Sequence, residues 1–154
     1  MKHVERQTIR VHYKYAASVE EVFDAWLDPQ KACKFLFATP NGQIVKTEID
    51  ARVGGSFLIV DQRDGVDIEH LGVYMEIDRP RHLIFLFRVP HYALESTRVR
   101  VGLIPLAVGC ELTISHEGVS EEWAKSAAEG WKSILEALEA VLTETTTKPM
   151  VPSE

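Results

Sequence analysis

Hydrophobic and polar residues alternate with a period of two along much of the chain, as they do in strands with one buried and one solvated face. In the first of these stretches, one face carries Ile9, Val11, Tyr13 and Tyr15. Similar stretches cover residues 43–50, 56–61, 68–77, 83–87, 97–103 and 110–116. Because short turns separate consecutive stretches, the pattern predicts an antiparallel meander.

Helical patterns appear after the first strand and at the end of the chain. Ser18 and Glu21 have the spacing of a capping box, and Asp28-Pro29 can end one helix and begin a second short one. From Ser120 to Leu142, apolar residues recur at steps of three and four, with charged residues on the other side. This last pattern predicts an amphipathic helix of about six turns that lies on an apolar surface.

The order of these elements predicts one α+β domain. A curved antiparallel sheet would wrap around the long C-terminal helix, with two short helices after the first strand. We assign residues 1–143 to this domain and residues 144–154, which are polar and contain two prolines, to a disordered tail. Gly130 lowers the stability of the long helix by about 1 kcal/mol relative to alanine. Space for a ligand, or close approach of another backbone, would explain a glycine at this position.

Four stretches of the chain carry a family resemblance. They are SVEEVFDAW at 18–26 followed by Asp28-Pro29, DARVGGSF at 50–57, residues 72–80 with 83–85, and HEG at 116–118 with Gly130-Trp131 and Ile134-Leu135. In order and spacing they resemble the START-like (SRPBCC) superfamily, in the branch related to the activator of the heat-shock protein 90 ATPase. The resemblance spans about residues 8–142 and implies the helix-grip fold of the birch-pollen allergen.

Charge and composition narrow the function. The 154 residues include 26% charged residues of both signs and carry a net charge of −6, unlike the basic stripe of a nucleic-acid binder. No apolar run approaches the roughly 18 residues of a membrane span, and Met1–Arg10 lacks the apolar core of a signal peptide. We therefore expect a cytoplasmic protein with no nucleic-acid partner and no membrane insertion.

Few residues point to catalysis. The chain has no nucleophile motif and no phosphate-binding glycine loop, and none of the six histidines forms a helical i, i+4 pair. Cys33 and Cys110 form neither a disulfide framework nor a metal-binding spacing, so we expect two small apolar side chains. We predict no metal site, no cofactor and no established catalytic residue.

His116 is the one weak candidate for chemistry. By alternation it shares the inward face of its strand with Leu112 and Ile114. An inward imidazole could bind a ligand or act as acid or base, or it could simply bond to backbone or water. On the strand at 68–77, His70, Tyr74 and Glu76 lie opposite an apolar set that includes Met75, which predicts that these three point outward.

A curved sheet that grips one helix tends to leave a cavity, and concave apolar sites bind small ligands. We expect this cavity to be lined by Phe35, Phe57, Met75, His116, Trp131 and Leu138. The preferred interpretation is a non-catalytic domain that binds a small apolar or amphipathic molecule. Because the family fold serves several functions, two alternatives stay open.

The first alternative is an enzyme of the cyclase, dehydratase or hydrolase type, with His116 as acid or base and Tyr74 or Glu76 as partner. The second is a stress-associated or chaperone-associated interaction module that uses the sheet surface or the apolar turn at 104–108. The resemblance also implies a homodimer. It gives little support to a chaperone partner, since this chain leaves no room for the activator's further N-terminal domain.

Overall fold

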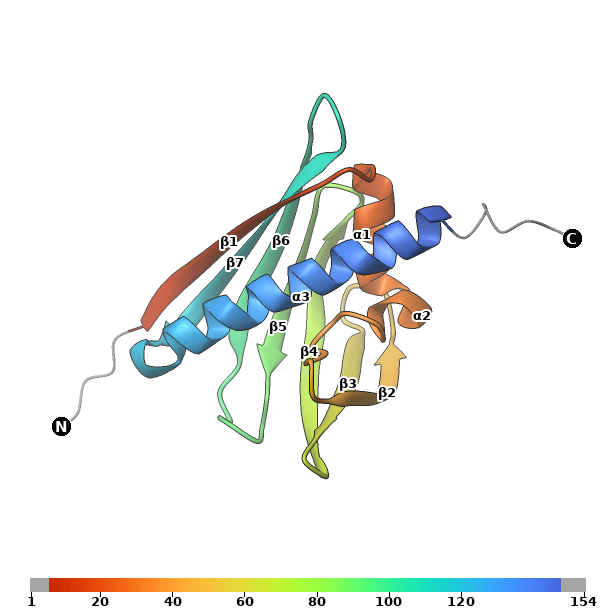
Figure 1. The fold of residues 1–154 in the computed structure, drawn as a ribbon. Coiled ribbons are helices and arrows are strands. Elements are labelled where there is room, and N and C mark those ends of the chain that lie inside the picture. The colour runs from red at the N-terminus through yellow and green to blue at the C-terminus, as the bar shows by residue number, and fades with distance from the viewer. Residues whose placement is uncertain (1–5, 148–154) are drawn as a thin grey trace, which may run out of the picture.

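The computed structural model describes residues 6–147 and has the predicted order of elements (Figure 1). Strand β1 covers Arg6–Tyr15, and helices α1 (Val19–Leu27) and α2 (Pro29–Ala32) follow it. The remaining elements are β2 (Gln43–Ile49), β3 (Ser56–Arg63), β4 (Val66–Asp78), β5 (His82–Arg88), β6 (Thr97–Pro105), β7 (Cys110–Ser120) and α3 (Glu121–Thr147).

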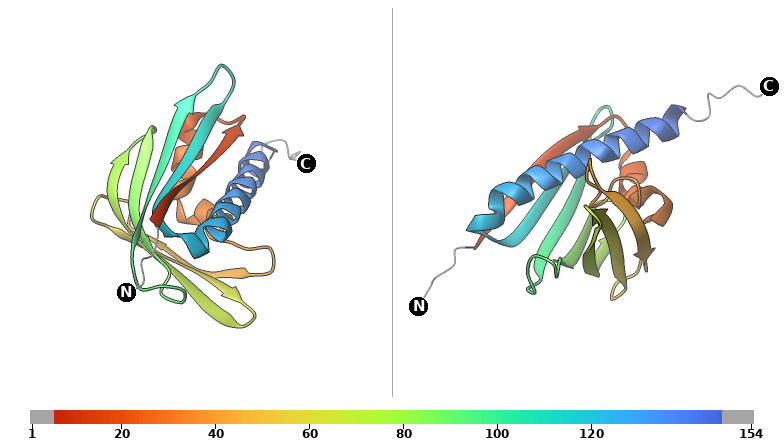
Figure 2. Two further views of the ribbon diagram at one scale, coloured as in Figure 1. Left: turned by 90° about the vertical axis from the view of Figure 1, so that its left-hand side faces the viewer. Right: turned by 60° about the horizontal axis from the view of Figure 1, so that its bottom comes forward.

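All seven strands form one antiparallel sheet in the order β1-β7-β6-β5-β4-β3-β2. Figure 2 shows that this sheet curves around α3, which lies across its concave side. Helices α1 and α2 lie near the C-terminal end of α3, where Lys34, just after α2, forms an ion pair with Glu144 at 3.3 Å. The predicted α+β helix-grip fold is confirmed.

The short helices begin as the sequence predicts. In α1, the Ser18 hydroxyl accepts a hydrogen bond from the Glu21 backbone, and the Glu21 carboxylate accepts one from the Ser18 backbone, both at 3.2 Å. The Asp28 side chain then caps α2 by accepting from the backbone N–H of Gln30 at 3.0 Å. Both caps satisfy N–H groups that have no partner within the helix.

Helix α3 supplies much of the core through its second half. Leu135 and Leu138 are fully buried, and the Tyr15 hydroxyl of β1 donates to the Leu135 carbonyl at 2.8 Å. The helix extends to Thr147, so residues 144–147, which the sequence assigns to the tail, continue it. Residues 148–154 of that predicted tail lie outside the described residues.

As far as Met75, the faces of β4 are the reverse of the prediction, whereas Glu76 is exposed as predicted. Met75, predicted to face inward, is 50% exposed on the convex side of the sheet, whereas Tyr74 is only 2% exposed. His70, also predicted to face outward, is buried on the concave side. The prediction was wrong because both faces of this strand carry apolar residues, so counting them does not identify the buried face.

Packing against β3 decides the orientation of β4. Gly72 faces the ring of Phe57, and a Cβ atom at this glycine would lie 2.1 Å from the Phe57 Cε2 atom. Only glycine leaves room for the ring on that face. A bulge between Tyr74 and Glu76 then shifts the alternation, so that Ile77 packs against the core although it lies two positions from Met75.

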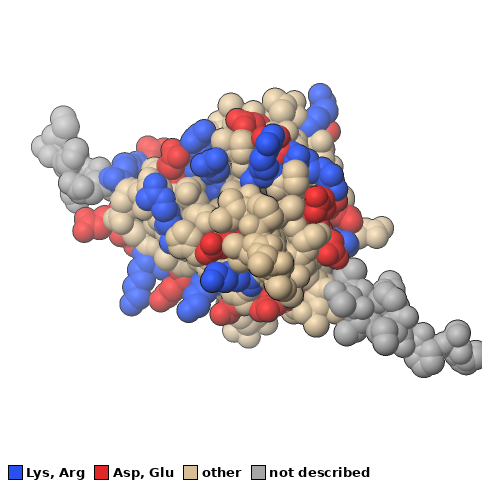
Figure 3. Space-filling model, turned by 90° about the horizontal axis from the view of Figure 1, so that it is seen from above, with Lys and Arg blue, Asp and Glu red and all other residues tan. Residues whose placement is uncertain are grey.

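Two features of the surface bear on possible partners. The apolar turn between β6 and β7 projects beyond the sheet (Figure 1), and its Val108 is 77% exposed. On the face seen in Figure 3, acidic and basic side chains are interspersed rather than gathered by sign.

Within residues 6–147, no helix has the length and hydropathy needed to cross a membrane.

Candidate ligand-binding pocket

A pocket of about 680 Å³ lies between the first half of α3 and the concave side of the sheet, and it is partly open to solvent. The helix contributes small residues to its lining, among them Ser126, Ala127 and Gly130. A Cβ atom at Gly130 would meet nothing within 4 Å. The small side chains therefore leave space beneath the helix that larger residues would fill.

Aromatic rings from four parts of the chain form one wall of this pocket. Phe37, in the loop after α2, stacks on His70 of β4 at 4.6 Å and on Phe87 of β5 at 4.9 Å between ring centroids. Trp131 of α3 lies 5.8 Å from Phe37 and 6.4 Å from Phe87. The wall is largely apolar, with Trp131 at 60° to Phe37 and 53° to Phe87, a surface suited to rings or extended hydrocarbon.

The placement of Phe37 depends on an unusual backbone conformation. Its φ of 63° lies in the left-handed region, which large side chains seldom adopt. The Phe37 carbonyl accepts a hydrogen bond from Nη2 of Arg63 at 3.4 Å. This bond holds the loop against β3 and directs the ring into the pocket.

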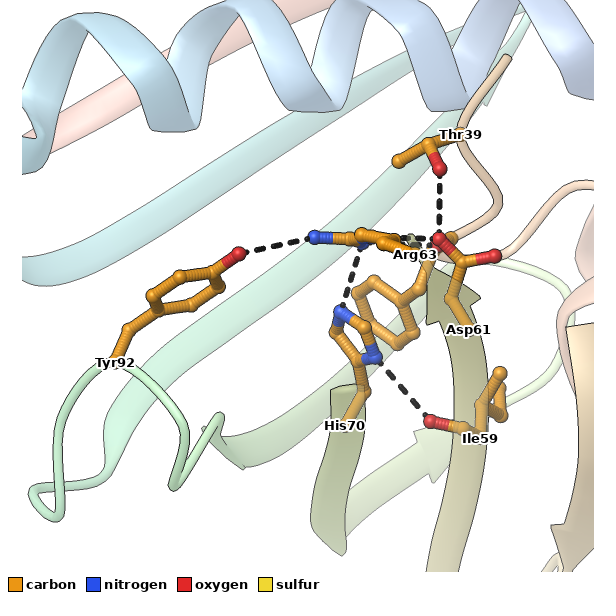
Figure 4. Close-up of polar contacts among 7 residues, drawn as sticks. Thr39, Ile59, Asp61, Arg63, His70 and Tyr92 are labelled. Atoms are coloured by element: carbon orange, nitrogen blue, oxygen red, sulfur yellow. Dashed lines mark hydrogen bonds and ion pairs between the residues drawn. The ribbon is translucent and has the colours of Figure 1, made fainter. Parts of the chain in front are cut away.

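A polar cluster stands beside the aromatic wall (Figure 4). Asp61 is fully buried and accepts from Nε of Arg63 at 2.6 Å and from the Thr39 hydroxyl at 2.7 Å. Nη1 of Arg63 donates to the Tyr92 hydroxyl at 3.3 Å. Figure 4 shows the Arg63 guanidinium between Asp61 and Tyr92, so that it faces the space under α3 with its counterion behind it.

His70 is neutral in this setting. Its burial, and secondly the charge of Arg63, lower its pKa to about 4. Nδ1 lies 3.2 Å from the Ile59 carbonyl and must carry the proton, since a carbonyl only accepts. Nε2 is then the acceptor and lies 3.5 Å from Nη2 of Arg63.

His116 is also neutral and fully hydrogen-bonded. Burial lowers its pKa to about 4. Nε1 of Trp131 donates to Nδ1 at 3.0 Å, so Nε2 carries the proton and donates to the Thr97 hydroxyl at 2.7 Å. That hydroxyl donates in turn to the Phe87 carbonyl at 3.3 Å. This chain of bonds ties α3 to β7, β6 and β5 and fixes the orientation of Trp131.

The six residues expected to line the cavity divide into three groups. Trp131 and His116 line the pocket. Phe35, Phe57 and Leu138 are buried in the core, where Phe35 packs on Trp26 and Phe57 stacks behind Phe37. Met75 lies on the opposite side of the sheet and contributes nothing to the pocket.

The sequence interpretation missed several residues of the pocket. Phe37 and Tyr92 lie in loops, where no periodicity signals an inward direction. Tyr92 is also 5.8 Å from Trp123 of α3, so these two half-exposed rings form part of the rim. His70 was assigned to the wrong face of β4. Asp61 and Arg63 lie two positions apart on β3, a signal that could have indicated the polar cluster.

Other groups of potential ligands lie elsewhere. Glu76, Asp78 and His82 place one potential metal-ligand atom each within 4.8 Å of one another. Within residues 6–147, they form the only group of three or more such side chains. They are exposed or half-buried at the β4–β5 hairpin, and the His82 ring is hydrogen-bonded to Glu76. Both cysteines are free thiols, with Cys110 buried. None of these groups reaches the pocket.

Comparison with known proteins identifies the family. A family model described as Activator of Hsp90 ATPase homolog 1-like protein matches residues 16–143. The chain belongs to this family. The resemblance read from the sequence is thus confirmed, and the family's START-like fold supports a ligand-binding type of domain. No curated protein sequence matches the chain.

Several solved structures share the fold of this Activator of Hsp90 ATPase homolog 1-like chain. A Chromobacterium violaceum protein is 28% identical, with a TM-score of 0.80 over 88% of this chain and 96% of its own. An Arthrobacter aurescens protein is 25% identical, with a TM-score of 0.78 over 92% and 91% of the two chains. An AHSA1-like protein from Aeromonas hydrophila is 16% identical, with a TM-score of 0.80 over 96% and 99%.

Proposed function

We propose that this protein binds a small amphipathic molecule in the pocket between α3 and the sheet. The observation that carries the proposal is the pocket itself, whose volume of about 680 Å³ falls within the range of roughly 300–1,000 Å³ typical of small-molecule sites. Its aromatic wall would receive the apolar part of the ligand. The polar cluster around Arg63 would receive a polar group.

The state of the two histidines favours binding over acid–base catalysis. A general base needs an unshared lone pair within reach of the substrate and a pKa near the working pH. In His116, Nδ1 is occupied by Trp131 and Nε2 by Thr97, and burial holds the pKa near 4. His70 is likewise bonded at both nitrogens. Both imidazoles therefore act as fixed structural groups of the pocket.

Filling the pocket from the helix tests the proposal. Gly130→Trp would place an indole in the open space beneath α3, and tryptophan is a better helix former than glycine, so the helix should persist. Lys132→Trp is the matched control, because Lys132 is exposed and does not line the pocket. The probe is N-phenylnaphthylamine, an uncharged aromatic molecule whose fluorescence rises in apolar surroundings.

We expect the wild-type protein and Lys132→Trp to bind the probe with similar affinity. Gly130→Trp should bind it at least about tenfold more weakly, which corresponds to about 1.4 kcal/mol. Circular dichroism and urea unfolding would verify that both variants are folded. Equal binding by Gly130→Trp, or no binding by the wild-type protein, would refute the proposal.

A further inference from the structure

We infer that the pocket selects ligands with an acidic group, a carboxylate or a sulfonate, which binds between Arg63 and Tyr92. The inference rests on the proposed function and specifies its ligand class. Both residues line the pocket, and the Tyr92 side chain is half-exposed, so an entering molecule can reach it. The polar cluster leaves part of its hydrogen-bonding capacity unused.

Arg63 has one donor to spare. A guanidinium carries five N–H groups. Nε uses its one N–H on Asp61, and Nη2 directs its two toward the Phe37 carbonyl and Nε2 of His70. Nη1 uses one of its two on the Tyr92 hydroxyl. The second N–H of Nη1 has no partner among the described residues.

Tyr92 supplies an adjacent donor. Its hydroxyl oxygen accepts from Nη1 of Arg63 at 3.3 Å, so its own proton stays available. The unused N–H of Arg63 and the O–H of Tyr92 therefore form a pair of neighbouring donors. The two oxygens of a carboxylate or sulfonate match such a pair, and hydrogen bonds to charged acceptors are the stronger kind.

Thr39 and His70 do not compete for these donors. The Thr39 hydroxyl gives its proton to Asp61, and both nitrogens of His70 are occupied. Asp61, although acidic, lies behind Arg63 and does not line the pocket. Its carboxylate balances the arginine charge without turning an acceptor toward the ligand.

The chemistry of the two donors favours an anion over a cation. Among the other charged residues of the lining, Arg6 and Glu95 form an ion pair with each other at 2.5 Å. Glu122, in the first turn of α3, forms no ion pair within residues 6–147. An ammonium group offers only donors, so placing it beside Arg63 and Tyr92 would leave polar groups on both sides unpaired.

A matched pair of probes tests the inference. Anilinonaphthalene sulfonate has the same aromatic skeleton as N-phenylnaphthylamine and adds one sulfonate. We expect the wild-type protein to bind the sulfonate about tenfold more tightly, the effect of one charge-assisted hydrogen bond that outweighs the loss of hydration. Gly130→Trp should weaken both probes.

Two variants locate the preference. Tyr92→Phe removes one donor and keeps the ring, so it should lower the affinity for the sulfonate several-fold and leave the uncharged probe unchanged. The double variant Asp61→Asn/Arg63→Gln should abolish the preference. The two substitutions are combined because removing Arg63 alone would leave the Asp61 carboxylate buried without a counterion, which endangers folding.

The outcomes separate this inference from the proposed function. If both probes bind the wild-type pocket equally, or if the preference for the sulfonate survives in both variants, the inference is overturned while ligand binding stands. If Gly130→Trp affects neither probe, the pocket is not the binding site and both proposals fall.

Discussion

Acidification from pH 7 to pH 5 should destabilise this protein through His70 and His116. Burial lowers the pKa of each to about 4, against 6.5 for an unperturbed histidine. Between these values the unfolded chain binds a proton at each site and the folded chain does not. Stability is therefore fully present above the unfolded pKa and is lost as the pH falls toward the folded one.

The size of the effect follows from the two pKa values. For one histidine with pKa 6.5 unfolded and about 4 folded, the free energy of unfolding falls by about 2 kcal/mol between pH 7 and pH 5. Two such residues give about 4 kcal/mol, a large share of the stability of a domain of this size. Asp24, whose pKa is lowered by its bonds to Arg79, adds to acid sensitivity only at lower pH.

Urea unfolding followed by tryptophan fluorescence at several values between pH 5 and pH 7 measures the slope. Near pH 5.2 the wild-type protein should take up close to two protons on unfolding, and each proton contributes about 1.4 kcal/mol per pH unit. His116→Asn keeps an acceptor for Nε1 of Trp131, and His70→Asn keeps a donor for the Ile59 carbonyl. On unfolding, each single variant should take up about one proton fewer than the wild-type protein, and the double variant about two fewer.

The slope, rather than the absolute stability, is decisive, because each substitution also costs a hydrogen bond at every pH. An unchanged slope in His116→Asn would show that this imidazole does not titrate as a buried neutral group. The hydrogen-bond chain through Trp131, His116 and Thr97 would then be assigned incorrectly.

Two glycines give predictions of opposite sign, both measured by urea unfolding at pH 7. Gly72→Ala should destabilise the folded protein by about 1–3 kcal/mol, since the new Cβ would lie 2.1 Å from the Phe57 ring. Phe37 and Phe85 pack against that ring and hold it in place. An unchanged stability would show that the ring can move. Gly130→Ala should stabilise by up to about 1 kcal/mol, because its Cβ meets nothing within 4 Å. A loss of stability there would mean that the space under α3 is not open.

The fold could be predicted because its elements have one buried face each. In α3 and in strands β1, β6 and β7, only one face is apolar, so the pattern fixes both the element and its orientation. Strand β4 differs, because both of its faces carry apolar residues. With Tyr74 and Met75 on opposite faces, the choice depends on the contact between Gly72 and Phe57, which lie on two different strands.

The pocket was less predictable because it depends on loops and on absent side chains. Trp131 and His116 could be found from periodicity. Phe37 enters the pocket through a left-handed backbone conformation, and Tyr92 enters from the β5–β6 loop, so neither has a repeating pattern. Phe35 and Leu138 were expected there only because large apolar residues line cavities and fill cores alike.

The three tryptophans offer the most direct test of ligand binding in the pocket. Trp123 and Trp131 line it, whereas Trp26 is buried in the core behind Trp131, 6.2 Å away between ring centroids. The indole N–H signals in a nitrogen–proton correlation spectrum can be followed while N-phenylnaphthylamine is added. Our account predicts that the signals of Trp123 and Trp131 shift with saturation and that the signal of Trp26, which does not line the pocket, shifts less. Saturating binding that leaves Trp123 and Trp131 unshifted would contradict it.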